Sequence, residues 1–226
     1  MKKHGFTMAE MLVTMGIIGV VATIMIPVIG NARPNVEMVM LKKAYYNTSR
    51  VVSELINDDE LYPENDEDEA HDGFSNITLE DQLGHEARFR GVEYSGESKF
   101  CGLFAAKLNA PGAASPDTIC SSQEDLPNGN FITADGAAWS MPVGSMANGG
   151  IIGVDVNGPN KGNNCSDGSV GTACGEGVAP DQFGISVGKY GEVALQSDLA
   201  REYIRSQNTS RKYAETVECM AKGTCK

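Results

Sequence analysis

Basic and aromatic residues are scarce in this sequence of 226 residues. Lys and Arg number 18 against 30 Asp and Glu, so the formal net charge is −12, and aromatic residues make up only 7%. Nucleic acid is therefore not indicated as a partner, because phosphate contacts need clustered basic side chains. The 41% of apolar residues still suffices for a globular core. The length suits one domain with an appendage and excludes a large multidomain enzyme.

Signatures of catalysis are also missing. Neither His71 nor His85 stands in a recognisable Ser or Cys nucleophile motif, and no phosphate-binding Gly loop, paired-acid motif or cofactor signature occurs. No two cysteines form Cys-x-x-Cys, which argues against a zinc site or a thiol redox site. We therefore expect a protein that is not an enzyme and that needs no organic cofactor.

What the sequence does contain is a long N-terminal run almost free of charge. Residues 6–29 hold one charged side chain, Glu10, and would span roughly 36 Å as a helix, which is enough to cross a bilayer. Lys2 and Lys3 precede the run, so the positive-inside rule predicts a cytoplasmic N-terminus and places the rest of the chain outside. Glu10 needs an interfacial position or a positive partner, because a carboxylate in a bilayer costs several kcal/mol.

The run follows a basic leader, Lys-Lys-His-Gly, and opens with Phe6-Thr-Met-Ala-Glu10-Met-Leu-Val. This combination resembles the class III signal of type IV pilins and type II secretion pseudopilins, and the resemblance covers residues 1–56. It implies that prepilin peptidase cuts after Gly5 and methylates the new amine of Phe6, while the apolar segment stays on the mature protein. The family's Glu at the fifth mature position corresponds to Glu10, and its helix-kinking Pro at the twenty-second corresponds to Pro27.

The position of the new amine suggests a role for Glu10. Removal of residues 1–5 would leave the amine of Phe6 one helical turn from Glu10. The Glu10 carboxylate of an incoming subunit could then pair with the Phe6 amine of the subunit before it, inside a helical bundle shielded from water. Gly16 and Gly19 would permit close helix contacts. We therefore expect that subunits can assemble only after the leader has been removed.

The residues after Pro34 predict an amphipathic helix that continues to Ile56 and packs under a globular head. Residues 57–69 carry eight acids and no base, which is typical of a solvated loop, with a cation site as the alternative. After this loop the sequence predicts irregular structure, which is followed by strands. The apolar stripe of the helix consists of Val36, Val39 or Met40, Ala44, Val51 or Val52, and Leu55.

Alternating apolar residues in the second half predict an antiparallel meander. Asp135–Gly136 suits a two-residue type I′ turn between its first two strands, and Asp198 is placed to cap a C-terminal helix. With the long N-terminal helix covering the apolar face, the expected fold is α+β and pilin-like. Strands are expected at residues 131–133, 137–141, 151–156, 183–187 and 192–195.

The expected domains follow from these elements. Residues 1–5 form the leader, residues 6–29 the transmembrane and assembly helix, and residues 30–56 the amphipathic helix that continues into the head. Residues 57–226 form an extracytoplasmic, disulfide-rich head.

The segment from Val154 to Gly162, with the later Asp181-Gln-Phe-Gly-Ile185, also resembles the C-terminal part of many pilin-like proteins, although the stretch between Cys165 and Cys174 interrupts the pattern. In some pseudopilins this loop binds calcium. Hard oxygen ligands of the kind calcium needs are offered here, but the EF-hand spacing is absent. We favour the alternative in which these Asp and Asn side chains cap turns and bind no calcium. The candidate ligands are Asp155, Asn157, Asn160 and Asp181.

Six cysteines in a head outside the cytoplasm indicate oxidation. They allow fifteen pairings. Sequence proximity favours three short loops, each of which would stabilise a Gly-rich head by about 2–4 kcal/mol. These join Cys101 with Cys120, Cys165 with Cys174, and Cys219 with Cys225.

The expected function is that of a structural subunit, minor rather than major, of a type IV pilus or type II secretion-like filament. Its expected partners are other pilin or pseudopilin subunits, prepilin peptidase, the inner-membrane assembly platform and, before assembly, membrane lipid. We expect it in the bacterial inner membrane and then in a filament on the cell surface or in the periplasm. Two alternatives stay open: a filament-tip or membrane-anchored adhesion module, and a secreted enzyme or binding protein whose signal peptide is cut after Gly30 and Ala32.

Overall fold

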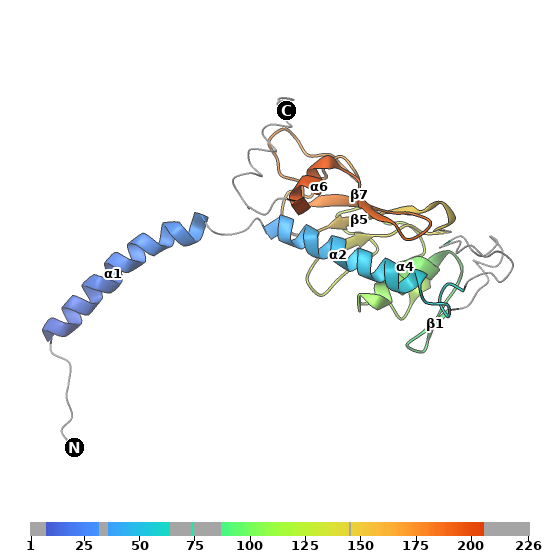
Figure 1. The fold of residues 1–226 in the computed structure, drawn as a ribbon, viewed down its shortest axis with the longest axis horizontal. Helices are drawn as coiled ribbons and strands as arrows, with labels where there is room; N and C mark the ends of the chain where they lie inside the picture. Colours follow the sequence, from blue (N-terminus) through green and yellow to red (C-terminus); the bar gives the residue numbers. More distant parts are fainter. Residues whose placement is uncertain (1–7, 32–35, 64–73, 75–86, 145, 206–226) are drawn as a thin grey trace, which may run out of the picture.

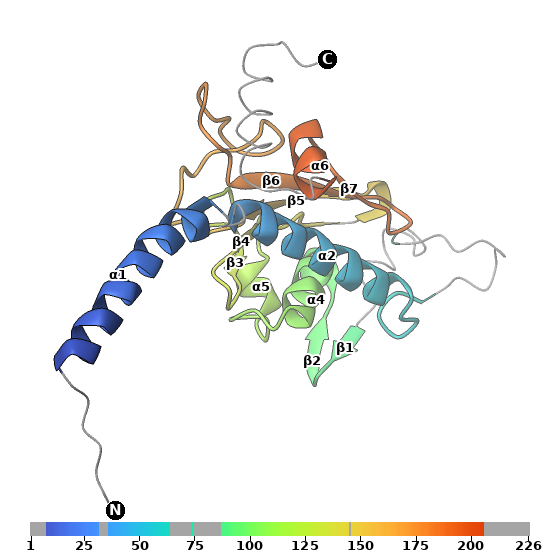
Figure 2. The ribbon, with the colours of Figure 1, turned by 60° about the vertical axis from the view of Figure 1, so that its left-hand side comes forward.

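A computed structural model describes residues 8–31, 36–63, 74, 87–144 and 146–205 of the chain. Two long helices, α1 (Met8–Asn31) and α2 (Val36–Ile56), precede the strands of the head. Figures 1 and 2 show α1 projecting away from the head and α2 lying along it. The fold is α+β, as the sequence predicted.

One face of α2 is buried, and its residues recur every three or four positions, as an amphipathic helix requires. The prediction was right for Ala44, Val51 and Leu55 but wrong for Val36, which is exposed. Of the two alternatives at the next turn, Met40 packs against the core, whereas Val39 is exposed. Hydrophobic periodicity shows that one face of a helix is apolar, but it does not show at which residue the contact with the head begins. Here the buried face begins at Met38, two residues after Val36. The buried residues are Met38, Leu41, Ala44, Thr48, Val51, Val52, Leu55 and Ile56.

The head contains a five-stranded antiparallel sheet in the order β3-β4-β5-β6-β7, so each strand pairs with its neighbour in sequence. This is the predicted meander. Val154 faces Trp139 on one side and Phe183 on the other, and all three side chains are buried. The strands are β3 (Phe131–Ile132), β4 (Ala138–Ser140), β5 (Gly150–Asp155), β6 (Gln182–Val187) and β7 (Val193–Leu195).

The turn between β3 and β4 differs from the predicted type I′ turn. The N–H of Gly136 donates to the carbonyl of Thr133 at 2.8 Å, and the N–H of Thr133 donates to the carbonyl of Ala137 at 2.9 Å. Gly136 has φ +92°, whereas Asp135 is not among the residues with positive φ. The loop therefore has three residues and ends in a glycine bulge. Asp135 instead pairs with Lys43 Nζ at 2.7 Å and ties the hairpin to α2.

Short elements fill the region that the sequence left irregular. A two-stranded hairpin precedes the helix α4, and α2 lies with α4 on one side and α6 on the other (Figures 1 and 2). Leu61 and Tyr62 are buried, so the first part of the acidic stretch is not simply a solvated loop. The elements are β1 (Ala87–Phe89), β2 (Val92–Tyr94), η2 (Gly96–Ser98), α4 (Lys99–Lys107), α5 (Pro116–Ile119) and η3 (Met146–Asn148).

The last described helix, α6 (Asp198–Arg205), follows β7 directly. Its cap is Ser197 and not Asp198, because the Ser197 hydroxyl accepts a hydrogen bond from the N–H of Ala200 at 3.1 Å. Tyr203 of α6 packs on Phe183 with ring centroids 5.7 Å apart. These contacts fasten α6 to the sheet.

Candidate functional site

Glu10 lies in the first turn of α1, and its neighbours on this helix are apolar. The side chains described on α1 are all exposed, including Met8 at 89% and Leu12 at 73%. A Cβ added at Gly16 or Gly19 would meet nothing within 4 Å. The head therefore does not cover this apolar surface.

The polar hydroxyls of α1 are satisfied inside the helix. Thr14 Oγ1 donates to the carbonyl of Met11 at 3.0 Å, and Thr23 Oγ1 donates to that of Gly19 at 2.7 Å. The helix continues through Pro27 and ends at Asn31. Gly5 and Phe6 lie outside the described residues. Among the residues that the structure describes, no helix combines the length and the apolar character needed to cross a bilayer.

Asp181, one of the candidate calcium ligands, organises the long loop between β5 and β6. Its Oδ2 accepts hydrogen bonds from the N–H groups of Asn163 and Asn164 at 2.7 and 3.0 Å. Its Oδ1 accepts the N–H of Cys165 at 3.0 Å. Asn157 Nδ2 is a further donor, 3.3 Å from Oδ2. The carboxylate is 1% exposed, so these donors replace the water it would otherwise bind.

Asp155 plays a similar part at the end of β5. Its Oδ1 accepts the N–H of Gly158 at 2.7 Å, and its Oδ2 lies 3.3 Å from Gln182 Nε2. Burial raises the pKa of Asp155, and the charge of Asp181 raises it further, against the opposing effect of the Gly158 N–H. The two carboxylates thus form a buried acidic pair held by N–H donors.

The structure brings Asp155, Asn157 and Asp181 together but leaves Asn160 exposed. The oxygens of both carboxylates already accept hydrogen bonds. The bond from the N–H of Gly158 to Asp155 is local, as turn capping by an Asx side chain is, whereas the donors to Asp181 lie 16 to 24 residues earlier in the chain. Asn157 Oδ1 and Asn164 Oδ1 are buried without a hydrogen-bond partner, and Asn164 was not among the predicted ligands. In the described part of the chain, no group of three or more His, Cys, Asp or Glu side chains could hold a metal ion. Calcium binding at this loop stays a prediction.

Two of the predicted disulfides are present. Cys101 of α4 is bonded to Cys120 just after α5, and Cys165 is bonded to Cys174 within the loop between β5 and β6. The third predicted pair, Cys219 with Cys225, lies outside the described residues. The first bond is fully buried, whereas Cys174 of the second is partly exposed.

A charged group that the sequence did not single out is Lys99, at the start of α4. It is 4% exposed, and its Nζ has no hydrogen-bond partner among the described residues. Nζ lies 4.4 Å from the centroid of the Tyr62 ring. Burial lowers the pKa of Lys99 to about 8. No local pattern in the sequence signals this enclosure, because Tyr62 and Lys99 are far apart in the chain.

The comparisons with known proteins concern the N-terminus. The family model described as the prokaryotic N-terminal methylation motif matches residues 1–26. This motif is the prepilin signal of type IV pilins and pseudopilins, so the resemblance expected from the leader, Phe6 and Glu10 is confirmed. No curated protein and no solved structure matches the chain.

Proposed function

We propose that this pilin-type precursor is a structural subunit, minor rather than major, of a type IV pilus or a type II secretion-like filament. The observation that carries the proposal is the methylation motif at residues 1–26, which includes most of the helix α1, whose described apolar side chains the head leaves uncovered. An exposed apolar surface of this extent marks a site of protein or membrane contact. The role is one of assembly rather than catalysis.

The proposed cycle begins in the membrane. The precursor inserts through its apolar N-terminal run with the head outside the cytoplasm, which the Lys residues of the leader favour. Prepilin peptidase then cuts after Gly5 and methylates the amine of Phe6. The inner-membrane assembly platform transfers the subunit from lipid to the filament, where α1 packs against the same helix of other pilin or pseudopilin subunits.

Glu10 supplies the charge that selects processed subunits. In lipid or in a helical bundle, its carboxylate is costly unless a positive group reaches it. The amine of Phe6 exists as an N-terminus only after cleavage. An uncleaved precursor cannot offer this amine, so assembly is coupled to processing.

The test is the mass of the N-terminal peptide of the protein purified from membranes of its native host. The proposal expects a peptide that begins at Phe6 and carries one methyl group. A Gly5→Leu variant should keep residues 1–5 and be absent from sheared filaments, with the wild-type chain as the matched control. A terminus near Arg33 would show a released protein and would overturn the proposal.

A further inference from the structure

Apolar side chains that the head leaves exposed gather on one face of α2. Outside α1, seven large hydrophobic side chains are exposed in the described part of the chain, and three of them lie on this helix. Val36 is 57% exposed, Val39 50% and Tyr46 63%. An exposed apolar cluster marks a contact surface more often than single exposed residues do. The other four, which are scattered over β3, β5 and two loops, are Ile132, Ile151, Val178 and Tyr190.

Two cations extend this face of α2. Lys43 pairs with Asp135 at 2.7 Å, and Arg50 lies 4.0 Å from Glu54. These pairs balance the two carboxylates, so the face carries no net negative charge, although the whole chain carries −12. The residues recur at steps of three and four and therefore share one side of the helix. We call this side the α2 stripe: Val36, Val39, Lys43, Tyr46 and Arg50.

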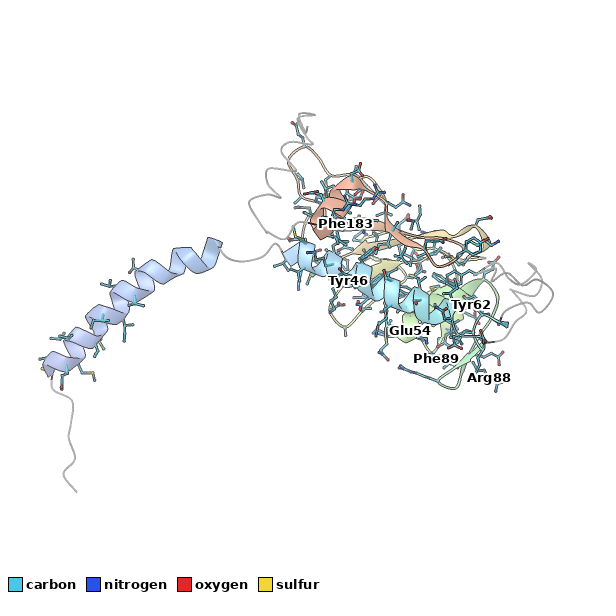
Figure 3. The ribbon with its side chains drawn as sticks, viewed as in Figure 1. Tyr46, Glu54, Tyr62, Arg88, Phe89 and Phe183 are labelled. Carbon is cyan, nitrogen blue, oxygen red and sulfur yellow. A yellow bond between two sulfur atoms is a disulfide. The ribbon has the colours of Figure 1, made fainter. Side chains whose placement is uncertain are left out.

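The exposed ring of Tyr46 is held in place by its neighbour. The Tyr45 hydroxyl donates to the carbonyl of Val193 at 3.2 Å, which fixes Tyr45 against β7. The rings of Tyr45 and Tyr46 meet edge-on with centroids 5.7 Å apart. Figure 3 shows Tyr46 in the part of α2 that lies nearer to α1. A contact at Tyr46 therefore costs little side-chain ordering.

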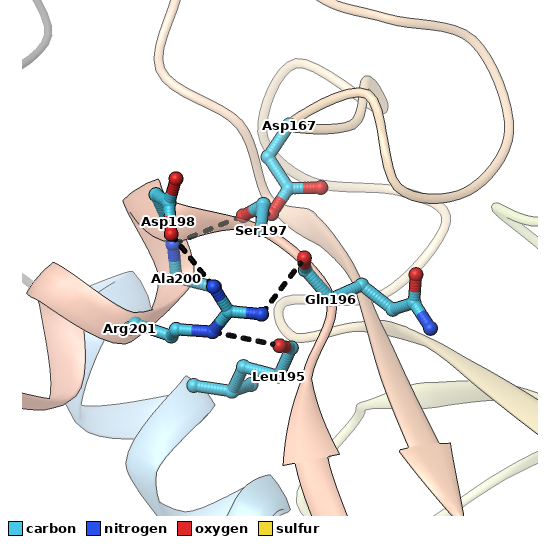
Figure 4. A network of polar contacts seen from close by, with 7 residues as sticks. All are labelled: Asp167, Leu195, Gln196, Ser197, Asp198, Ala200 and Arg201. Carbon is cyan, nitrogen blue, oxygen red and sulfur yellow. Dashed lines mark hydrogen bonds and ion pairs between the residues drawn. The ribbon is translucent and has the colours of Figure 1, made fainter.

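The β7 edge of the sheet, in contrast, is closed. Arg201 donates to the carbonyls of Leu195 and Gln196 at 3.1 and 3.4 Å and pairs with Asp198 at 2.6 Å (Figure 4). The carbonyl of Val193 is taken by Tyr45. An edge whose carbonyls are occupied does not accept an added strand. The described residues thus close this edge but leave the α2 stripe open.

The α2 stripe begins close to the end of α1. Helix α1 ends at Asn31 and α2 begins at Val36, and these five steps of chain can span at most about 18 Å. If α1 crosses a bilayer, the start of α2 therefore lies near the lipid headgroups. In Figures 1 and 2 the axes of α1 and α2 are not collinear. A membrane-spanning α1 would then leave α2 inclined over the lipid surface.

The polarity of the α2 stripe increases with distance from α1. Val36 and Val39 come first, Lys43 lies about 10 Å beyond Val36, and Tyr46 and Arg50 follow. A lipid surface has the same gradient, from acyl chains to phosphates. Tyr, Lys and Arg are the residues typical of that boundary. A protein partner would require no such order, so the sequence of residues along the stripe favours lipid.

We propose that the α2 stripe rests on the phospholipid surface before the subunit enters a filament. The contact rests on the proposed function, in which α1 spans the membrane at this stage. Val36 and Val39 reach the upper acyl chains, and the Tyr46 ring lies among the headgroups. Lys43 and Arg50 donate to lipid phosphates with the N–H groups that their carboxylate partners leave free. The membrane thereby holds the head in one orientation, and assembly has to lift the stripe from the lipid.

The experiment places a tryptophan on the α2 stripe of the full chain in vesicles of phosphatidylcholine and phosphatidylglycerol. Trp139 is the single native tryptophan and is buried, so the wild type gives the background emission. With phosphatidylcholine brominated near the top of its acyl chains, Tyr46→Trp should lose about half of its added emission and Tyr190→Trp less than about a tenth. Tyr190→Trp is the matched control, because Tyr190 is 56% exposed and precedes Gly191, where a Cβ would meet Ile56 at the other end of α2.

A second substitution tests the apolar part of the contact. Val39→Glu, added to Tyr46→Trp, should reduce the quenching at least about twofold, because a charge replaces an apolar side chain at the lipid surface. Val178→Glu makes the same change at an exposed loop valine and should leave the quenching unchanged. Near-ultraviolet circular dichroism checks that each variant keeps the fold of the head.

Three results would overturn the contact. Equal quenching of Tyr46→Trp and Tyr190→Trp, in vesicles that retain the chain during alkaline carbonate extraction, would exclude it and leave the proposed function intact. Protection of Tyr46→Trp from both brominated lipid and aqueous acrylamide would show that protein covers the stripe instead. A chain that carbonate extracts from the vesicles is not anchored in the membrane, and the proposed function then fails together with the contact.

Discussion

α1 and α2 are both long helices rich in apolar residues, yet they differ in what covers them. On α2 the side chains of Leu41, Val51 and Leu55 are fully buried against the head. On α1 every described side chain is exposed. The head therefore buries the apolar side chains of α2 but not the described ones of α1. The apolar side chains of α1 are therefore not part of the folded core. An exposed apolar surface of this kind is typical of a site that contacts lipid or another protein.

The two regions also differ in how they hold a charge. Lys99 is enclosed in the head, where its Nζ lies 4.4 Å from the centroid of the Tyr62 ring. Glu10 lies on the uncovered helix, where a second molecule can reach it. A charge enclosed by its own chain affects the stability of the fold, whereas we expect a charge on an uncovered helix to act between molecules.

Truncation of an apolar side chain in each helix is the strongest test of this difference. Leu41→Ala on α2 removes a fully buried side chain and should lower the free energy of unfolding of the head by about 2–5 kcal/mol. Leu12→Ala on α1 should change it by less than about 0.5 kcal/mol, because Leu12 is exposed. Denaturant unfolding of both variants in detergent measures this. Equal losses would mean that the head covers α1 as well.

The disulfides extend the comparison into the head. Cys101 and Cys120 are buried, whereas Cys174 is partly exposed. A mild thiol reductant should therefore open Cys165–Cys174 first, since the attacking thiolate must reach a sulfur atom. Replacing Cys165 and Cys174 with Ser should cost about 2–4 kcal/mol of stability. Alkylation followed by peptide mass analysis measures the order. Earlier alkylation of Cys101 would contradict it.

The sequence predicted most of what depends on periodicity. α2 and the strands around Val154 and Phe183 have strong patterns, and the structure places them where expected. The predicted face of α2 was wrong at Val36, because a helical stripe does not show at which residue the contact with the head begins. The β1–β2 hairpin was missed, since Arg90 is not a residue typical of a type I′ turn.

The candidate sites show the same limit. Turn capping by Asx side chains was predicted, and Asp155 makes such a local contact with the N–H of Gly158. The donors to Asp181 lie 16 to 24 residues earlier in the chain, so only the fold brings them to one carboxylate, and no local pattern could predict them. Short disulfide loops could be predicted because sequence proximity limits which cysteines meet. The role of Glu10 stays a prediction, and it could be made because the spacing of Glu10 from Gly5 is local.

The effect of an enclosed charge on the stability of the head can be tested at Lys99. The pKa of Lys99 is about 8 in the fold, below the usual 10.5, so the unfolded chain binds more protons between these values. The stability of the head should therefore rise as the pH increases from 8 toward 9.5, below the range in which tyrosines ionise. Lys99→Met should raise the free energy of unfolding at pH 7 by roughly 2 kcal/mol and flatten this rise. Denaturant unfolding of both proteins at several pH values measures it. A variant less stable than the wild type would show that the ammonium has a partner.

Glu10 should have the smallest effect on the fold and a large effect on assembly. Glu10→Ala should change the stability of the head by less than about 0.5 kcal/mol, because the helix that carries it lies outside the core. Membrane insertion should persist, since the substitution makes the run more apolar. Filament growth should fall sharply, because the Phe6 amine of the neighbouring subunit loses its partner. Glu202→Ala, at an exposed position of α6, is the matched control. Normal filaments from Glu10→Ala would remove the pairing argument and leave apolar packing as the sole basis of assembly.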